Sequence, residues 1–146
     1  MQKNFLASNN KFTIKNCKKL IKKALNDNAP ILFVEYRGYD STNKKLLNVI
    51  KNNKKYYSNI YVVKKSEDNG ASDISKFVDS YNLPKNFVIC GVNTSFCITK
   101  TIIGLSEKYP NSKIKFVKKA SNCITGIYHE SGSKFIAGIS DNIFVK

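Results

Sequence analysis

The sequence predicts a three-layer αβα domain whose central sheet is mostly parallel. Short runs that are apolar throughout alternate with segments whose apolar residues recur at helical spacing. This pattern is typical of strands buried on both faces and joined by covering helices. The chain has 146 residues, which is the size of one domain. We therefore expect a single domain over residues 1–146 with right-handed crossovers.

In the first half of the chain, two helices alternate with two strands. Thr13 is the expected cap of the first helix, because a hydroxyl oxygen can accept from a free N–H of the first turn. Ser41 or Thr42 can cap the second helix in the same way. The expected elements are a helix over 13–26, a strand over 31–36, a helix from the second cap to about Tyr57 and a strand over 60–63.

The second half continues the alternation. Gly70 and Pro84 bracket a third helix, since these residue types interrupt regular structure. The tail after Ala120 has a weaker pattern. The expected elements are a helix through 74–81, a strand over 87–90, a helix from about Phe96 through Leu105, a strand over 114–117, a short helix around 132–137 and a last strand over 143–145.

The chain is strongly basic. It has 25 Lys and Arg residues against 10 Asp and Glu residues, a net charge of +15. Such a charge favours binding to nucleic acid or another polyanion. An alternative is compositional, because every basic residue except Arg37 is a lysine and Asn is abundant, as an AT-rich genome tends to produce. Lysines dispersed over solvated helix faces would then carry no function.

Membrane and secreted classes are not expected. The longest apolar runs are about four or five residues, too short to span a bilayer. The first residues contain no apolar segment of signal-peptide length. We therefore expect a soluble, cytoplasmic protein.

The cysteine and histidine content limits the possible sites. The four cysteines, Cys17, Cys90, Cys97 and Cys123, include no CxxC pair, so the spacing of a zinc site is absent. Without a secretion signal they are expected to be free thiols. The one histidine, His129, excludes a site of three histidines.

A ligand site in this type of fold lies beyond the carboxyl ends of the strands. That edge comprises residues 35–39, 64–70, 91–97 and 118–123. Within it, Cys97 follows a buried strand and a turn and stands at the expected start of a helix. Free N–H groups and the helix dipole favour a thiolate there and can bind an oxyanion. The alternative is that Cys97 is a small buried side chain, the role we expect for Cys17 and Cys90.

Residues 87–105, FVICGVNTSFCITKTIIGL, resemble the nucleophile segment of the isochorismatase-like cysteine hydrolases. This Rossmann-like family includes nicotinamidases, N-carbamoyl amidohydrolases and isochorismatases. Its motif is an apolar strand followed by Gly-Val-x-Thr-x-x-Cys-Val and a helix. The resemblance implies that Cys97 is the nucleophile and that the peptide between Val92 and Asn93 is cis. It also implies an oxyanion hole from the N–H groups of Asn93 and Cys97.

Two upstream segments, VEYRGYDST and VVKKSEDNG, are similar to a branch of the same family. In the second segment, the spacing to the following Asp-Asn-Gly makes Lys65 the better match to the family's catalytic lysine. Lys64 is the alternative. The alternative for both lysines is that they lie at a solvated strand end and have no role in a site.

The family's third catalytic residue, an Asp that ends its first strand, has no counterpart here. The chain begins MQKNFL, which matches the family only from the residue after that Asp, so the first strand is missing as well. We therefore expect an unfilled or differently filled position between the strands that begin at Ile31 and Phe87. Glu35, at the end of the neighbouring strand, is the only nearby acid that could substitute, and we do not expect it to do so.

The resulting hypothesis is a cysteine hydrolase that acts on a small amide or related C–N bond through a covalent thiol intermediate, with impaired activity. One alternative is an inactive family member that binds a small ligand or a protein partner, and another is a basic nucleic-acid-binding module. We expect a small-molecule substrate, homo-oligomers, no membrane partner and no cofactor. We also expect no metal, because the family's metal site needs more histidines than His129 alone.

We predict that Cys97 is the most reactive thiol of the chain. Alkylation at neutral pH, followed by peptide mass spectrometry against time, should mark Cys97 first. Faster modification of Cys17 or Cys123 would contradict the nucleophile assignment.

Overall fold

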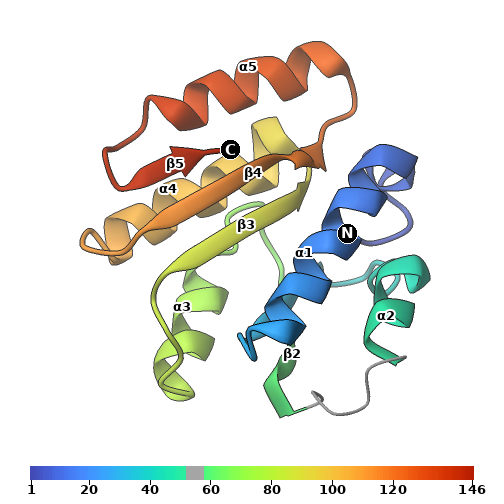
Figure 1. The fold of residues 1–146 in the computed structure, drawn as a ribbon. Coiled ribbons are helices and arrows are strands. Elements are labelled where there is room, and N and C mark those ends of the chain that lie inside the picture. The colour runs from blue at the N-terminus through green and yellow to red at the C-terminus, as the bar shows by residue number, and fades with distance from the viewer. Residues whose placement is uncertain (52–57) are drawn as a thin grey trace.

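The computed structural model describes residues 1–51 and 58–146 and has alternating strands and helices (Figure 1). The helices are α1 (Lys11–Asn26), α2 (Lys44–Lys51), α3 (Ala71–Ser80), α4 (Thr99–Lys108) and α5 (Gly126–Ala137). The strands are β1 (Ile31–Tyr36), β2 (Ile60–Lys65), β3 (Phe87–Val92), β4 (Ile114–Asn122) and β5 (Ile143–Val145). A 3-10 turn covers Leu6–Asn9, and a π-helical turn covers Thr94–Ile98.

Several element boundaries differ from those predicted. Helix α1 begins two residues before Thr13, and Asn10 caps it by accepting from the Thr13 N–H at 2.9 Å. Helix α5 begins at Gly126 rather than near residue 132, with Thr125 as its cap. The predicted end of the second helix, about Tyr57, lies outside the described residues. Strand β4 continues to Asn122, well past the apolar run that predicted it.

The strands form two parallel sheets. Strand β1 pairs with β2 from Ile31–Ile60 to Tyr36–Lys65, and β3, β4 and β5 form the second sheet in that order. Among the described residues, no ladder joins β1 to β3. The expected open position therefore exists between these two strands, and they do not close it by pairing directly.

The N-terminal residues lie at this open position. The Met1 carbonyl accepts from the Asn43 N–H at 2.8 Å, and the Met1 sulfur lies 3.4 Å from the sulfur of Cys17. The Gln2 side-chain amide bonds both backbone groups of Tyr36, donating to its carbonyl at 2.9 Å and accepting from its N–H at 2.7 Å. A side chain of the N-terminal segment thus satisfies the free edge at the end of β1.

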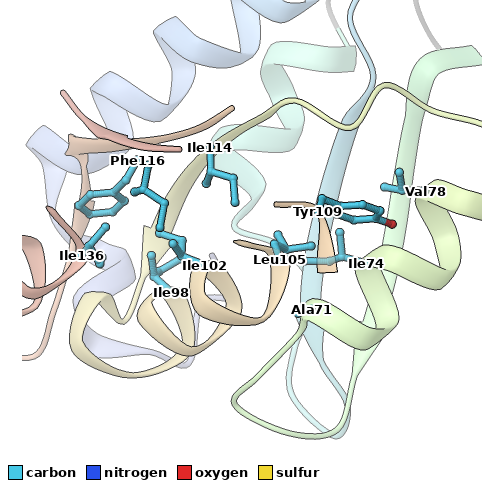
Figure 2. Close-up of a cluster of buried hydrophobic side chains, with 11 residues drawn as sticks. Ala71, Ile74, Val78, Ile98, Ile102, Leu105, Tyr109, Ile114, Phe116 and Ile136 are labelled. Atoms are coloured by element: carbon cyan, nitrogen blue, oxygen red, sulfur yellow. The ribbon is translucent and has the colours of Figure 1, made fainter. Parts of the chain in front are cut away.

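Helices cover both faces of the sheets, which gives three layers. On one face, α1 and α2 bury a cluster that includes Ile14, Leu46 and Phe33 of β1, with Cys90 of β3 packed against it. On the other face, α3, α4 and α5 enclose a second cluster (Figure 2). The predicted α/β fold with parallel sheets is confirmed. No helix in residues 1–51 and 58–146 is both long and apolar enough to cross a membrane.

The second cluster holds the largest fully buried side chains. Phe116 and Ile114 of β4 contact Ile102 of α4, and all three are fully buried. Leu32 and Val34 of β1 also pack against this cluster. Each of the two cores therefore contains side chains from both sheets.

Candidate functional site

The segment that holds Cys97 leaves β3 through an irregular backbone. Gly91 has a φ of +137°, a region that L side chains rarely adopt. The next peptide but one, between Val92 and Asn93, is cis, at the position that the resemblance implies. The chain then forms the π-helical turn, in which the Ile98 N–H donates to the Asn93 carbonyl at 3.1 Å. Cys97 therefore lies in this turn, two residues before α4 begins at Thr99.

Thr94 anchors the turn to the second sheet and to α5. Its buried hydroxyl donates to the Asn122 carbonyl at 3.0 Å and lies 2.8 Å from Nδ1 of His129. Because the hydroxyl hydrogen is used on Asn122, His129 donates to Thr94 through Nδ1–H. The histidine that sequence analysis left outside the site thus supports the cysteine turn through Thr94.

The two candidate lysines point to opposite faces of β2. Lys65 is 6% exposed, whereas the side chain of Lys64 is 47% exposed. Lys65 lines the same cavity as Cys97, and its Nζ lies 5.1 Å from the centre of the Tyr36 ring. Lys64 instead pairs with Glu35. The alternation of side chains along a strand decides between the neighbours and puts Lys65 beside Cys97.

A carboxylate that sequence analysis did not single out lies next to the thiol. Asp68 Oδ1 is 3.5 Å from the Cys97 sulfur, and its Oδ2 is 3.0 Å from Nζ of Lys100 on α4. Lys65 Nζ donates to the backbone carbonyl of Asp68 at 2.6 Å. The loop after β2 and the turn after β3 therefore meet at one point.

The thiol is held in its protonated form. Burial raises the pKa of Cys97, the Lys65 ammonium lowers it in part, and the Asp68 carboxylate raises it further. The hydrogen bond from Lys100 lowers the pKa of Asp68. The sequence-based expectation of a thiolate at a helix N-terminus is therefore wrong for the resting site, because burial and a neighbouring carboxylate outweigh the N–H groups.

Cys97 and Lys65 share a small, partly open cavity. This cavity of about 30 Å³ is lined by Met1, Gln2, Phe5, Val34, Tyr36, Lys65, Val92 and Cys97. It holds roughly two water molecules. Phe5 stacks on Tyr39 with ring centres 5.2 Å apart, so the N-terminal segment and the loop after β1 form its outer wall.

Glu35 is not positioned to serve Cys97. Its buried carboxylate accepts from Lys64 Nζ at 2.5 Å and from the Thr42 N–H at 2.6 Å. Burial alone would raise the pKa of Glu35, but these two hydrogen bonds lower it below its usual value. Glu35 therefore joins β1, β2 and the start of α2 as a structural group.

The remaining cysteines lie away from this geometry. Cys17 is buried and donates to the Ala120 carbonyl at 3.1 Å, with the Cys90 sulfur 3.9 Å away, and Cys123 is also buried. In the part of the chain that the structure describes, no group of three or more His, Cys, Asp or Glu side chains could hold a metal ion.

Sequence reasoning missed Asp68, Lys100 and Tyr36. Tyr36 and Asp68 lie in the quoted upstream segments, but nothing in one sequence shows that they face Cys97. Lys100 is one of many lysines, and only its position three residues after Cys97 sets it apart.

We predict that Glu35→Gln destabilises the chain by about 1–3 kcal/mol at pH 7, because two hydrogen bonds to a buried carboxylate are weakened. The folded pKa of Glu35 lies below its unfolded value of roughly 4.3. Its stabilisation is therefore complete above that value and is lost as the pH falls through the folded pKa. Urea unfolding at pH 7 and at pH 3.5 should show a smaller difference between variant and parent at the lower pH. The exposed Glu67→Gln is the control, and an equal deficit at both pH values would contradict the prediction.

Comparisons with known proteins agree on the architecture. No protein-family model matches the chain, and no curated protein matches it in sequence. Among solved structures, a nicotinamidase from Staphylococcus aureus is 16% identical with a TM-score of 0.72, over 99% of this chain and 93% of that one. An isochorismatase-like hydrolase from Alkaliphilus metalliredigens is 14% identical with a TM-score of 0.70, over 92% and 79%. A ribonuclease from Caenorhabditis elegans is 17% identical with a TM-score of 0.74, over 92% and 67%. The chain therefore has the fold of the isochorismatase-like hydrolases, as the resemblance of its cysteine segment implies.

Proposed function

We propose that the chain is a cysteine hydrolase that cleaves a small amide or related C–N bond through a covalent thioester on Cys97. The observation that carries this proposal is that Lys65, the last residue of β2, and Cys97, which follows β3 of the other sheet, line one small cavity at the carboxyl edge. A nucleophile and a buried cation at a cavity wall are the groups that acyl transfer requires.

The position of each residue around the cavity indicates its role in the proposed reaction. Cys97 sulfur attacks the carbonyl carbon of the substrate. The backbone N–H of Asn93 lies within hydrogen-bonding reach of that sulfur, so the oxygen of the tetrahedral intermediate forms beside it. The N–H groups of Asn93 and Cys97 hold that oxyanion, and the Lys65 ammonium stabilises the negative charge that develops on sulfur and oxygen.

The cavity limits the substrate. The cavity is small, about 30 Å³, and Met1 and Phe5 of the N-terminal segment form part of its lining. Lys65 and the Tyr36 ring form its polar wall, and Val34 and Val92 line the rest. We therefore propose a small, compact amide as the substrate class.

We predict that the chain hydrolyses one or more members of a panel of small amides, including nicotinamide, and that Cys97→Ala lowers the rate at least about 10³-fold. Release of ammonia and mass spectrometry of the trapped thioester measure the two steps. Cys123→Ala is the matched loss of a buried thiol and should keep most of the activity. A chain extended before Met1 by a strand that ends in Asp is assayed in parallel. If neither form turns over any amide, the inactive family member that binds a ligand or protein partner becomes the better proposal.

Nucleic-acid binding is the second candidate, and the charge of +15 favours it. Five exposed lysines lie on α1 and leave its outer face strongly basic: Lys11, Lys15, Lys19, Lys22 and Lys23. The fold is shared with a protein described as a ribonuclease, which is compatible with this use of the scaffold. Homo-oligomers and a cytoplasmic location also stay proposals.

If the basic face binds nucleic acid, the affinity for a random single-stranded RNA should fall steeply with salt, with a log–log slope of about −0.7 per phosphate contact. Fluorescence anisotropy between 50 and 300 mM KCl measures this slope. Replacing Lys15, Lys19 and Lys22 by Gln should reduce it, whereas Lys85→Gln, an exposed lysine elsewhere, is the control. Affinity that does not depend on salt would contradict this candidate.

A further inference from the structure

We infer that Asp68 is the acid–base residue of this site, which takes the proton of the Cys97 thiol and returns it to the leaving amine. The inference rests on the cysteine-hydrolase function proposed above. It assigns a role to a residue for which the resemblance provides none.

The two oxygens of the Asp68 carboxylate have separate partners. Oδ1 accepts from the Cys97 thiol at 3.5 Å, and Oδ2 accepts from Lys100 Nζ at 3.0 Å. One oxygen is thus kept as a proton acceptor toward sulfur, while the other is held by a cation. The side chain of Asp68 is 40% exposed, so water can reach the carboxylate for the second half of the reaction.

The charges around Asp68 favour this role. Lys100 of α4 and Lys65 of β2 both lower the pKa of Asp68, so its carboxylate is ionised at neutral pH. The Cys97 thiol stays protonated, because its own burial and the negative charge of Asp68 both raise its pKa. The phenol of Tyr36 also faces the group and is neutral, because burial and the negative charge of Asp68 raise its pKa. A protonated thiol against an ionised carboxylate is the starting state of general-base catalysis.

The loop that carries Asp68 is fixed at both ends. Lys65 Nζ holds the Asp68 carbonyl at 2.6 Å, and the Gly70 N–H donates to Thr101 Oγ1 at 3.0 Å. The Asn69 side chain accepts from the Ala71 N–H at 2.9 Å and so caps the start of α3. Because Thr101 belongs to the helix that follows Cys97, the same contacts that fix the loop also set its distance from the thiol.

The proton balance closes with this one residue. Asp68 takes the thiol proton as the sulfur–carbon bond forms, and it gives that proton to the amine nitrogen as the C–N bond breaks. Water then adds to the thioester carbonyl while Asp68 takes one of its protons. The C–S bond breaks, and Asp68 returns that proton to the Cys97 sulfur. The products are a carboxylic acid and an amine or ammonia, and no other reactant is consumed.

The test combines turnover with alkylation, because a base and a merely structural residue affect them differently. In Asp68→Asn, kcat/KM should fall about 10²–10⁴-fold. Iodoacetamide reacts with the thiolate, and loss of the carboxylate charge lowers the thiol pKa, so alkylation of Cys97 at pH 7 should become about three- to tenfold faster. Glu67→Gln removes one negative charge from the same loop and should change both rates less than twofold.

A second variant keeps the test independent of any folding defect in Asp68→Asn. Lys100 is exposed, and Lys100→Met removes the cation that lowers the pKa of Asp68. Because a general base must be ionised, the acid limb of kcat/KM should move to higher pH. Lys108→Met, at the other end of α4, is the control and should leave the profile in place.

Four outcomes would overturn the inference. Asp68→Asn with turnover within threefold of the parent would show that no proton passes through Asp68, and slower alkylation together with slower turnover would indicate a structural role. Turnover only by the chain extended with a strand that ends in Asp would assign the acid elsewhere while the cysteine-hydrolase function stands. If neither chain turns over any amide, the inference falls with the function on which it rests.

Discussion

Side chains pack across the open position between β1 and β3, and the rest of the structure depends on this packing. No backbone ladder in the described residues joins the two strands, so the sheets are held together by the two cores that flank them. Phe33 and Val34 of β1 each pack into a different core, together with side chains from the second sheet. Apolar burial of roughly 25 cal/mol per Å² therefore replaces the hydrogen bonds that a neighbouring strand would supply.

The candidate site spans the same open position between β1 and β3. Lys65 ends β2 of one sheet and Asp68 lies in the loop after it, whereas Cys97 follows β3 of the other sheet. The distance between the Asp68 carboxylate and the Cys97 thiol is therefore set by how the two cores position the sheets. The free backbone groups at the end of β1 still need partners, and the amide of Gln2 provides them. The N-terminal segment thus satisfies the end of β1 and also contributes Met1, Gln2 and Phe5 to the lining of the cavity.

Much of the architecture could be predicted from local pattern alone. Residues 31–36 and 143–145 have the predicted strand bounds because each is a short apolar run with clear ends. Strand β4 was predicted too short because its second half, Lys118 to Asn122, is largely polar. That half pairs with β3 only after a register shift that sets Gly91 opposite Ser121. Such pairing depends on the partner strand and not on the sequence of β4.

In the candidate site, too, some residues could be predicted from local pattern and others could not. The spacing of a known motif indicated Cys97, and the alternation along β2 separates Lys65 from Lys64 once the burial of each is known. Asp68 could not be predicted, because its contact with Cys97 joins residues 29 positions apart in sequence. The expected direction of the thiol pKa was wrong for a related reason. A helix N-terminus is visible in a sequence, whereas burial and a carboxylate brought in by another loop are not.

The lack of a side chain at Gly104 affects the geometry of the candidate site, although Gly104 carries no reactive group. A Cβ at this position would lie 2.6 Å from Cβ of Ala71 and 3.1 Å from the side-chain amide of Asn69. Helix α4 can therefore approach the loop that carries Asp68 only because residue 104 has no side chain. A single methyl group there would push the loop and the helix that follows Cys97 apart. The spacing between Asp68 and Cys97 is thus open to adjustment, in evolution or in engineering, at a position that has no side chain of its own.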